Sequence, residues 1–282
     1  MPEGPEVATL SKYLNTCILN NTVKSIQALS GRYTVTPIKN LDDFKKTLPT
    51  KIVATHYHGK FLYLEFMNSP NAKPWWAFIT LGLSGRVLVN NPVTNIDYKY
   101  NRIEIKTNEE NTIHFTDKLS YGTFSLTNNK KDLDTKLRGL GVDFTKSNNH
   151  VGNFKQIKAI LGRARKKNRP ICDVLLDQKM FAGVGNYIRA DVLYLAKVDP
   201  FTTIENLTDG ELKRLVELSH KIINSSHACQ MEYLKKNPYN YQELTQCYKF
   251  LVYQQKITAK KEPVLSKKHN GRKIWYVVAH LP

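Results

Sequence analysis

The sequence predicts an α+β protein with two domains and a terminal hairpin, and three features of the 282-residue chain support this. Residues 22–127 alternate hydrophobic and polar side chains in short runs separated by Asn, Gly and Pro, which is typical of an antiparallel sheet. From residue 154 the hydrophobic period lengthens to 3.6, as in helices. The last segment is strand-like and carries eight Lys or Arg against one acid, Glu262. We expect a sheet domain over 1–127, a linker over 128–153, a helical domain over 154–248 and a β-hairpin over 249–282.

The first predicted element is a helix that starts directly after the N-terminal motif. Val7, Leu10, Leu14 and either Cys17 or Ile18 recur at helical spacing. The strands expected after it are 52–57, 61–66, 76–79, 86–89, 102–106, 112–115 and 123–126.

The second half predicts helices joined by short turns. The linker is rich in Asn, Lys, Asp and Gly, although its Leu137–Phe144 part can pack. Thr208 and Glu211 fit a capping box, so a helix should begin there. The expected helices are 154–162, 170–178, 187–196 and 209–224.

The composition indicates a globular protein with a polyanionic partner. The chain is 41% hydrophobic and 10% aromatic, with a net charge of +18. An excess of positive charge of this size usually neutralises the phosphates of a nucleic acid. The alternative is a charge that keeps the protein soluble or binds it to a membrane surface. No apolar run approaches the ~18 residues of a membrane span and no signal peptide is evident, so we expect a soluble, intracellular protein.

The four cysteines are scattered and form no C-x-x-C pair. A zinc site needs clustered ligands, and a disulfide framework would be denser. We therefore predict reduced, mostly buried thiols.

The N-terminus places a proline beside a glutamate, Pro2 and Glu3. Removal of the initiator methionine would leave a secondary amine that titrates near pH ~7.7–8.0, so part of it is neutral and nucleophilic at physiological pH. Attack of this amine on a sugar C1′ or an aldehyde gives an iminium ion, which acidifies the adjacent C–H and permits elimination. The alternative is structural, because Pro5 and Glu6 suit the start of a helix.

Two glycine-containing turns are candidate anion sites. In Gly183-Val-Gly185-Asn186, the glycines let backbone amides approach a ligand, and Asn186 would cap the next helix, whose dipole favours an anion. A basic run over 163–169 precedes it, although a tight structural turn explains the pattern nearly as well. Lys60 follows Gly59 at the head of a strand, where it can project from a turn or be an ordinary exposed lysine.

Six motifs occur in the order and approximate spacing of one family. The chain resembles the formamidopyrimidine-DNA glycosylase / endonuclease VIII (Fpg/Nei) enzymes from residue 2 to about residue 276. The motifs are Pro2-Glu3, Lys60, Leu81–Gly85, Leu175–Gln178, Ala182–Asn186 and Asn270–Trp275.

The resemblance implies a fold and a set of roles. Residues 2–127 would form a β-sandwich flanked by helices, and residues 170–196 a helix-two-turn-helix element, with DNA in the cleft. Pro2 would be the Schiff-base nucleophile, Glu3 the acid that opens the sugar and shuttles protons, and Glu6 a supporting carboxylate.

The resemblance also implies three phosphate contacts. Lys60 and Asn186 would hold the backbone around a flipped nucleotide, with Gly183 and Gly185 beside Asn186. Arg272 would grip a phosphate with a bidentate fork.

Two departures from the family pattern refine this expectation. The four cysteines of the family's zinc finger are missing although Gly271–Trp275 is retained, so the chain resembles the Nei-like branch with a zincless finger and needs no metal. The segment Asp117–Gly122 lacks the family's arginine and phenylalanine, so Leu83, Leu119 and Tyr121 are candidates to fill the gap left by a flipped base. Loss of that arginine predicts a loose opposite-base preference.

The expected function is a bifunctional DNA glycosylase and AP lyase of base excision repair. It would excise oxidised pyrimidines, and also formamidopyrimidines and hydantoins, and then cut the strand by β,δ-elimination without a cofactor. We expect a monomer that binds damaged double-stranded DNA, with single-stranded DNA as an open second partner. The alternatives are a non-catalytic damaged-DNA-binding protein and an RNA-binding helix-two-turn-helix module. Whether Tyr239 or Tyr241 stacks on the flipped base stays open.

Overall fold

The computed structural model describes the chain except residues 1, 91–98, 147–149, 165–167, 238–246 and 279–282. It divides into two compact units. The sheet unit contains Pro2 and Val7–Arg138, and the helical unit contains Glu3–Glu6 together with Gly139–Pro282. The four residues Glu3–Glu6 therefore belong with a unit whose other residues begin more than 130 positions later.

The sheet unit is built on eight antiparallel strands in the order β5-β7-β6-β1-β2-β3-β4-β8. The strands are β1 Thr22–Ala28, β2 Thr50–His58, β3 Phe61–Met67, β4 Trp75–Thr80, β5 Gly85–Val89, β6 Asn101–Thr107, β7 Thr112–Asp117 and β8 Thr123–Thr127. Its helices are α1 Gly4–Ile18, which starts in the helical unit, α2 Leu41–Lys45 and α4 Lys130–Arg138, with a 3-10 turn, η1, at Gly31–Thr34.

The sheet folds back on itself. Its two halves join through a short pairing, in which Thr22 and Val23 of β1 lie opposite Lys51 and Thr50 of β2. The ring of Phe115 in β7 lies 6.3 Å from that of Phe124 in β8, although these strands are far apart in the strand order. This confirms the expected sandwich.

Helix α1 packs as its sequence pattern predicts. Val7, Leu10, Leu14 and Ile18 are fully buried, whereas Cys17 is half-buried, so Ile18 completes the hydrophobic face.

The segment predicted as a linker is largely folded. It contains α4, and β9 (Val142–Asp143), which pairs in parallel with β10 (Phe181–Ala182). Phe144 is fully buried and stacks on Phe181 with 5.9 Å between ring centroids. The C-terminal part of Leu137–Phe144 thus packs in the core of the helical unit.

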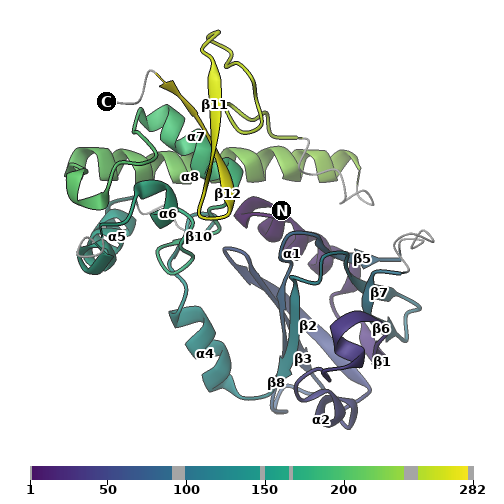
Figure 1. The fold of residues 1–282 in the computed structure, drawn as a ribbon. Helices are drawn as coiled ribbons and strands as arrows, with labels where there is room; N and C mark the ends of the chain where they lie inside the picture. The colour runs from purple at the N-terminus through teal and green to yellow at the C-terminus, as the bar shows by residue number, and fades with distance from the viewer. Residues whose placement is uncertain (1, 91–98, 147–149, 165–167, 238–246, 279–282) are drawn as a thin grey trace. The chain divides into compact units, whose positions relative to one another are not determined.

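The helical unit contains α5 His150–Ala164, α6 Ile171–Val174, α7 Asn186–Ala196, a 3-10 turn, η3, at Ile204–Asn206, and α8 Asp209–Lys236. In Figure 1, α8 is the long light-green helix beside α7. The predicted capping box is confirmed, because the Thr208 side chain accepts from Glu211 N and Thr208 N donates to Glu211.

Two helix lengths differ from the prediction. The helix expected over 170–178 stops at Val174, because the Gln178 side chain bonds Val184 O and Gly183 N and stabilises a turn. Helix α8 continues twelve residues beyond the expected end at residue 224. Ser226 and Gln230 are fully buried there, and this tertiary contact outweighs the weak helix propensity of Asn224-Ser225-Ser226.

The terminal hairpin is confirmed but begins later than expected. Its strands are β11 (Val264–His269) and β12 (Arg272–Val277), and residues 249–263 form bends and turns with an isolated bridge between Ile257 and Pro263. Asn270 and Gly271 have φ of 46° and 77°, which suits a two-residue type I′ turn. Ile274 is fully buried in the core of the helical unit.

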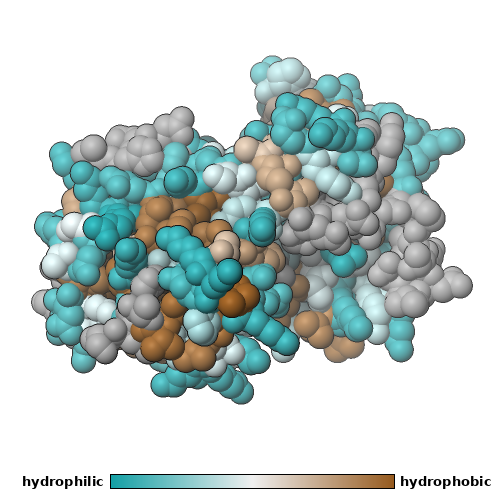
Figure 2. All heavy atoms as spheres, turned by 90° about the horizontal axis from the view of Figure 1, so that it is seen from above, coloured by the Kyte–Doolittle hydropathy of each residue, from teal (hydrophilic) through white to brown (hydrophobic). Residues whose placement is uncertain are grey.

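The prediction of mostly buried thiols is wrong for three of the four cysteines. All four are free, but only Cys172 is buried. Among the described residues, no helix combines the length and hydrophobicity that crossing a membrane requires. On the face shown in Figure 2, hydrophilic residues surround smaller groups of hydrophobic ones.

Candidate active site

The Glu3 carboxylate lies at the N-terminus of α7. Glu3 Oε1 accepts from Tyr187 N at 3.0 Å, and Oε2 lies 3.4 Å from Ile188 N. Backbone amides at a helix start favour an anion. Glu3 is only 2% exposed. Its buried carboxylate therefore occupies the helix start where the sequence predicted a bound ligand anion.

The Gly183-Val-Gly185 turn lies against the N-terminal segment. A Cβ on Gly185 would lie 2.1 Å from Glu3 Cδ. Gly4 N donates to Gly183 O at 2.8 Å, and Gly183 has a φ of 94°. Gly185 therefore admits Glu3, and the Gly183 amide is occupied by Gln178 Oε1 at 3.0 Å.

Asn186 does not cap α7, contrary to the expectation. The N-cap is Gly185, and Asn186 is the first helical residue. Its Nδ2 donates to Lys273 O at 3.1 Å, and its Oδ1 accepts from Arg189. Asn186 thus connects α7 to the residue after Arg272.

Glu6 is the centre of a buried polar network. Glu6 Oε2 accepts from Glu3 N at 2.7 Å, and Oε1 accepts from Tyr187 OH at 3.1 Å and from Gln230 Nε2. Ser226 Oγ lies 3.1 Å from Tyr187 OH and accepts from Gln230 at 3.2 Å. Burial raises the pKa of Glu6, although these hydrogen bonds oppose it. The network fixes the backbone of Glu3, one residue from Pro2.

Tyr187, Ser226 and Gln230 were missed as site residues from the sequence. Tyr187 follows Asn186 directly, which is a weak signal. Ser226 and Gln230 are four residues apart, so both lie on one face of α8. The helix predicted from the sequence ended at residue 224, before either of them.

Two other candidates lie in the sheet unit. Pro2 is half-buried. Lys60 is in the two-residue turn between β2 and β3, where Gly59 has a φ of 55°. The predicted tight turn before the strand is confirmed.

The three candidate gap-filling side chains are exposed on two neighbouring loops. Leu83, Leu119 and Tyr121 are 45%, 51% and 64% exposed. Ser84 Oγ donates to Asp117 and accepts from Leu119 N at 2.8 Å. The other Asp117 oxygen accepts from Gly122 N at 2.6 Å, so the buried Asp117 ties the loops together.

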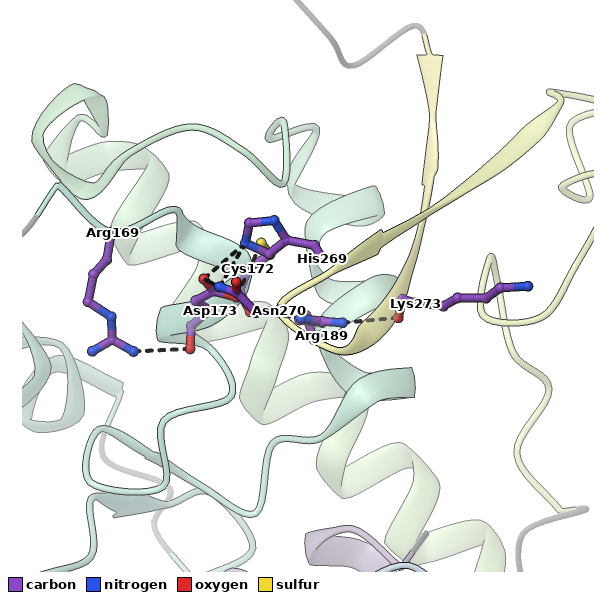
Figure 3. Close-up of polar contacts among 7 residues, drawn as sticks. All are labelled: Arg169, Cys172, Asp173, Arg189, His269, Asn270 and Lys273. Atoms are coloured by element: carbon purple, nitrogen blue, oxygen red, sulfur yellow. Dashed lines mark hydrogen bonds and ion pairs between the residues drawn. The ribbon is translucent and has the colours of Figure 1, made fainter.

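Arg272 lines a pocket of about 510 Å³ in the helical unit. Arg169, Arg189, Asp173 and His269 also line it. Arg169, from the basic run, pairs with Asp177 at 3.0 Å. In Figure 3, His269 and Asn270 point toward Asp173. Tyr239 and Tyr241 lie outside the described residues.

A potential metal-ligand cluster occurs in this region. In the described part of the chain, Cys172, Asp173 and His269 place their ligand atoms within 4.8 Å of one another. The cysteine thiol is buried, and burial raises its pKa to about 12, which opposes the thiolate that binds metals.

A folded-back antiparallel sheet, a helical unit with a Gly-Val-Gly-Asn turn and a terminal hairpin define the helix-two-turn-helix class of two-domain proteins. Family models agree with this assignment. The formamidopyrimidine-DNA glycosylase N-terminal domain matches residues 1–124, and the formamidopyrimidine-DNA glycosylase H2TH domain matches residues 149–235. The chain belongs to the formamidopyrimidine-DNA glycosylase family.

Individual relatives are similar over most of their length. The formamidopyrimidine-DNA glycosylase of Streptococcus agalactiae is 30% identical over 218 residues, covering 76% of this chain and 74% of the relative. That of Prochlorococcus marinus is 26% identical over 225 residues, or 76% of each chain.

Solved structures support the fold. Lactococcus lactis Fpg in complex with DNA containing an abasic site has a TM-score of 0.78 at 19% identity, covering 99% of both chains. MutM in complex with DNA containing carbocyclic 8-oxo-G also has a TM-score of 0.78, at 20% identity and 99% coverage of both.

Proposed function

We propose that this DNA glycosylase of the Fpg family is a bifunctional enzyme that excises oxidised bases from duplex DNA and then cleaves the strand. The observation that carries the proposal is the Glu3 carboxylate, bound at the start of α7 and covalently next to Pro2. An amine and a proton-transferring group side by side are what Schiff-base chemistry at a sugar carbon needs.

The mechanism begins with the Pro2 amine. Its nitrogen attacks C1′ of the flipped nucleotide, and the glycosidic bond breaks with its electron pair going to the base, which takes a proton from water. The Glu3 carboxylate, held by the backbone amides of Tyr187 and Ile188, can accept the amine proton and return it to O4′ as the sugar ring opens. The resulting iminium ion acidifies C2′–H.

Two eliminations follow from that acidity. Loss of the C2′ proton expels the 3′-phosphate, and a second elimination expels the 5′-phosphate, leaving a one-nucleotide gap. The iminium ion is the electron sink in both steps, so the residues of this chain suffice for them.

DNA binding is assigned to the basic side chains and the exposed loops. We assign Lys60, Asn186 and Arg272 to phosphates around the flipped nucleotide, which accords with the net charge of +18. Leu83, Leu119 and Tyr121 would fill the vacated space, and the tie through Asp117 would hold their loops in place.

The substrate class follows from those loops. They present apolar and aromatic side chains and no arginine that could read the opposite base. We therefore assign oxidised pyrimidines as main substrates, with formamidopyrimidines and hydantoins. The terminal hairpin lacks cysteine, which supports the Nei-like branch with a zincless finger.

The test is borohydride trapping by protein with a free N-terminal proline. The duplexes contain an abasic site, thymine glycol or 8-oxoguanine, and the variants are Pro2→Gly and Glu3→Gln, with the exposed Glu205→Gln as the charge-matched control. We expect a covalent adduct on the abasic and thymine glycol duplexes. Pro2→Gly should weaken it, and Glu3→Gln should bind DNA but react about 10²–10⁴-fold more slowly. Tight binding without any adduct would indicate a non-catalytic damage-binding protein, and equal affinity for structured RNA an RNA-binding module.

A further inference from the structure

The tip of the terminal hairpin is anchored on both sides of Arg272. Before it, Asp173 Oδ2 accepts from His269 Nε2 at 3.0 Å and from Asn270 Nδ2 at 2.6 Å. After it, Lys273 O accepts from Asn186 Nδ2 at 3.1 Å and from Arg189 Nη2 at 3.2 Å. Figure 3 shows His269 and Asn270 directed at Asp173, and Arg189 directed at Lys273.

The hairpin needs such anchors. A two-stranded hairpin alone is marginally stable in water. Most β11 side chains are exposed, and in β12 only Ile274 and Val277 are buried, both on the C-terminal side of the turn. Apart from the edge-on contact of the His269 ring with Phe201 at 5.7 Å, hydrogen bonds therefore hold the residues that flank Arg272.

Arg189 is suited to the second anchor. Its side chain is only 1% exposed, and its Nη1 also donates to Cys172 O at 3.2 Å. A planar guanidinium can thus connect α6, Asn186 and the hairpin in one geometry, which lysine could not do.

The charge of Asp173 is unexpected for a pocket that binds phosphate. The pocket contains Arg169, Arg189 and Arg272, and an acid among them lowers the positive potential that attracts an anion. The hydrogen bonds of Asp173 to His269 and Asn270 are a structural contribution that can outweigh this electrostatic cost.

We propose that Asp173 and Arg189 are positioning residues that hold Arg272 in the conformation that grips phosphate. This rests on the proposed function, in which Arg272 binds the DNA backbone. Asp173 fixes the turn before Arg272, and Arg189 fixes the carbonyl after it. Neither needs to touch DNA.

The sign of the effect separates this role from simple electrostatics. Asp173→Asn removes a negative charge beside the pocket, so electrostatics alone would strengthen DNA binding. Positioning predicts the reverse, because an amide oxygen is a weaker acceptor for His269 and Asn270. We expect Kd for abasic-site duplex to rise about tenfold. We also expect the slope of log Kd against log salt concentration to fall by about 0.9, which corresponds to the loss of one phosphate contact.

The experiment is a double-mutant cycle between Asp173→Asn and Arg272→Ala, with Glu205→Gln as the charge-matched control and thermal melting of each variant. Asp173→Asn should add no further loss in the Arg272→Ala background, and Glu205→Gln should leave binding at or above wild type. Asn270→Ala removes a donor from the hairpin side, and it should reproduce the effect if Asp173→Asn melts too early.

Three results would overturn the inference. Unchanged or tighter binding by Asp173→Asn means that the anchor is not needed, and an additive loss means that Asp173 does not act through Arg272. Weaker binding by wild-type protein in EDTA means that Cys172, Asp173 and His269 hold a metal ion instead. If Arg272→Ala itself binds normally, the phosphate role in the proposed function fails first.

Discussion

Gly185→Ala is the sharpest test of the Glu3 position. The new Cβ would lie 2.1 Å from Glu3 Cδ and 2.3 Å from Oε1, whereas ordinary contacts begin near 3.4 Å. Glu3 must therefore move by roughly 1 Å or more and leave Tyr187 N and Ile188 N. The backbone conformation at Gly185 is no obstacle, because its φ of −128° is open to alanine.

The expected losses follow from those contacts. Two hydrogen bonds from backbone amides to a buried carboxylate should cost about 1–3 kcal/mol of unfolding free energy. A displacement of about 1 Å at a reacting group can cost about 10²-fold in rate. We expect single-turnover strand cleavage to slow by about that factor, while the free energy of unfolding falls only modestly.

The assay is single-turnover cleavage of an abasic-site duplex beside urea denaturation, with Gly162→Ala as the matched control. Gly162 lies within α5, and a Cβ there meets nothing within 4 Å. Alanine should stabilise that helix by about 0.5–1 kcal/mol and leave the rate unchanged. A Gly185→Ala rate within about threefold of wild type would refute the claim that catalysis depends on this position of Glu3.

Three further predictions concern other parts of the site. Burial raises the pKa of Glu6 above its unfolded value, so the stability due to this group is greatest below pH 4.5 and falls as the pH rises. Relative to Glu6→Gln, wild type should therefore lose unfolding free energy as the pH rises above 4.5 in urea titrations, and parallel curves would contradict this. Ser84→Ala, which releases Leu119 N, should slow excision more than abasic-site cleavage in parallel single-turnover assays; equal slowing would argue against gap filling. Arg272→Lys should recover little of the affinity lost in Arg272→Ala, because lysine lacks the bidentate fork, whereas full recovery in filter binding would rule the fork out.

Features encoded by neighbouring residues were predictable. The capping box of Thr208 and Glu211 is a local signal and formed as expected, and the strand-like C-terminal segment does contain a β-hairpin. The strands were predicted from the alternation of hydrophobic and polar residues. Successive side chains of a strand point to opposite faces, so a sheet with one buried face imposes this alternation.

Features that depend on distant residues were not predictable in detail. The start of α7 was recognisable as an anion site, but nothing local showed that the anion is Glu3. The end of α8 was misplaced because Ser226 and Gln230 are stabilised by Glu6 and Tyr187. The anchoring role of Asp173 requires knowing that the hairpin turn reaches α6.

The pairing of Glu3 with Tyr187 spans 184 residues, and this has a consequence for synthesis in the cell. At ~5–20 residues per second, ribosomes need about 10–40 s to make that stretch. Until then the backbone amides of Tyr187 and Ile188, which bind the Glu3 carboxylate, have not been synthesised, even if the sheet unit has already folded. A prematurely terminated chain would therefore carry Pro2 and Glu3 without the helix that orients the carboxylate. Such a fragment could fold its sheet and still lack the helix start that holds the Glu3 carboxylate.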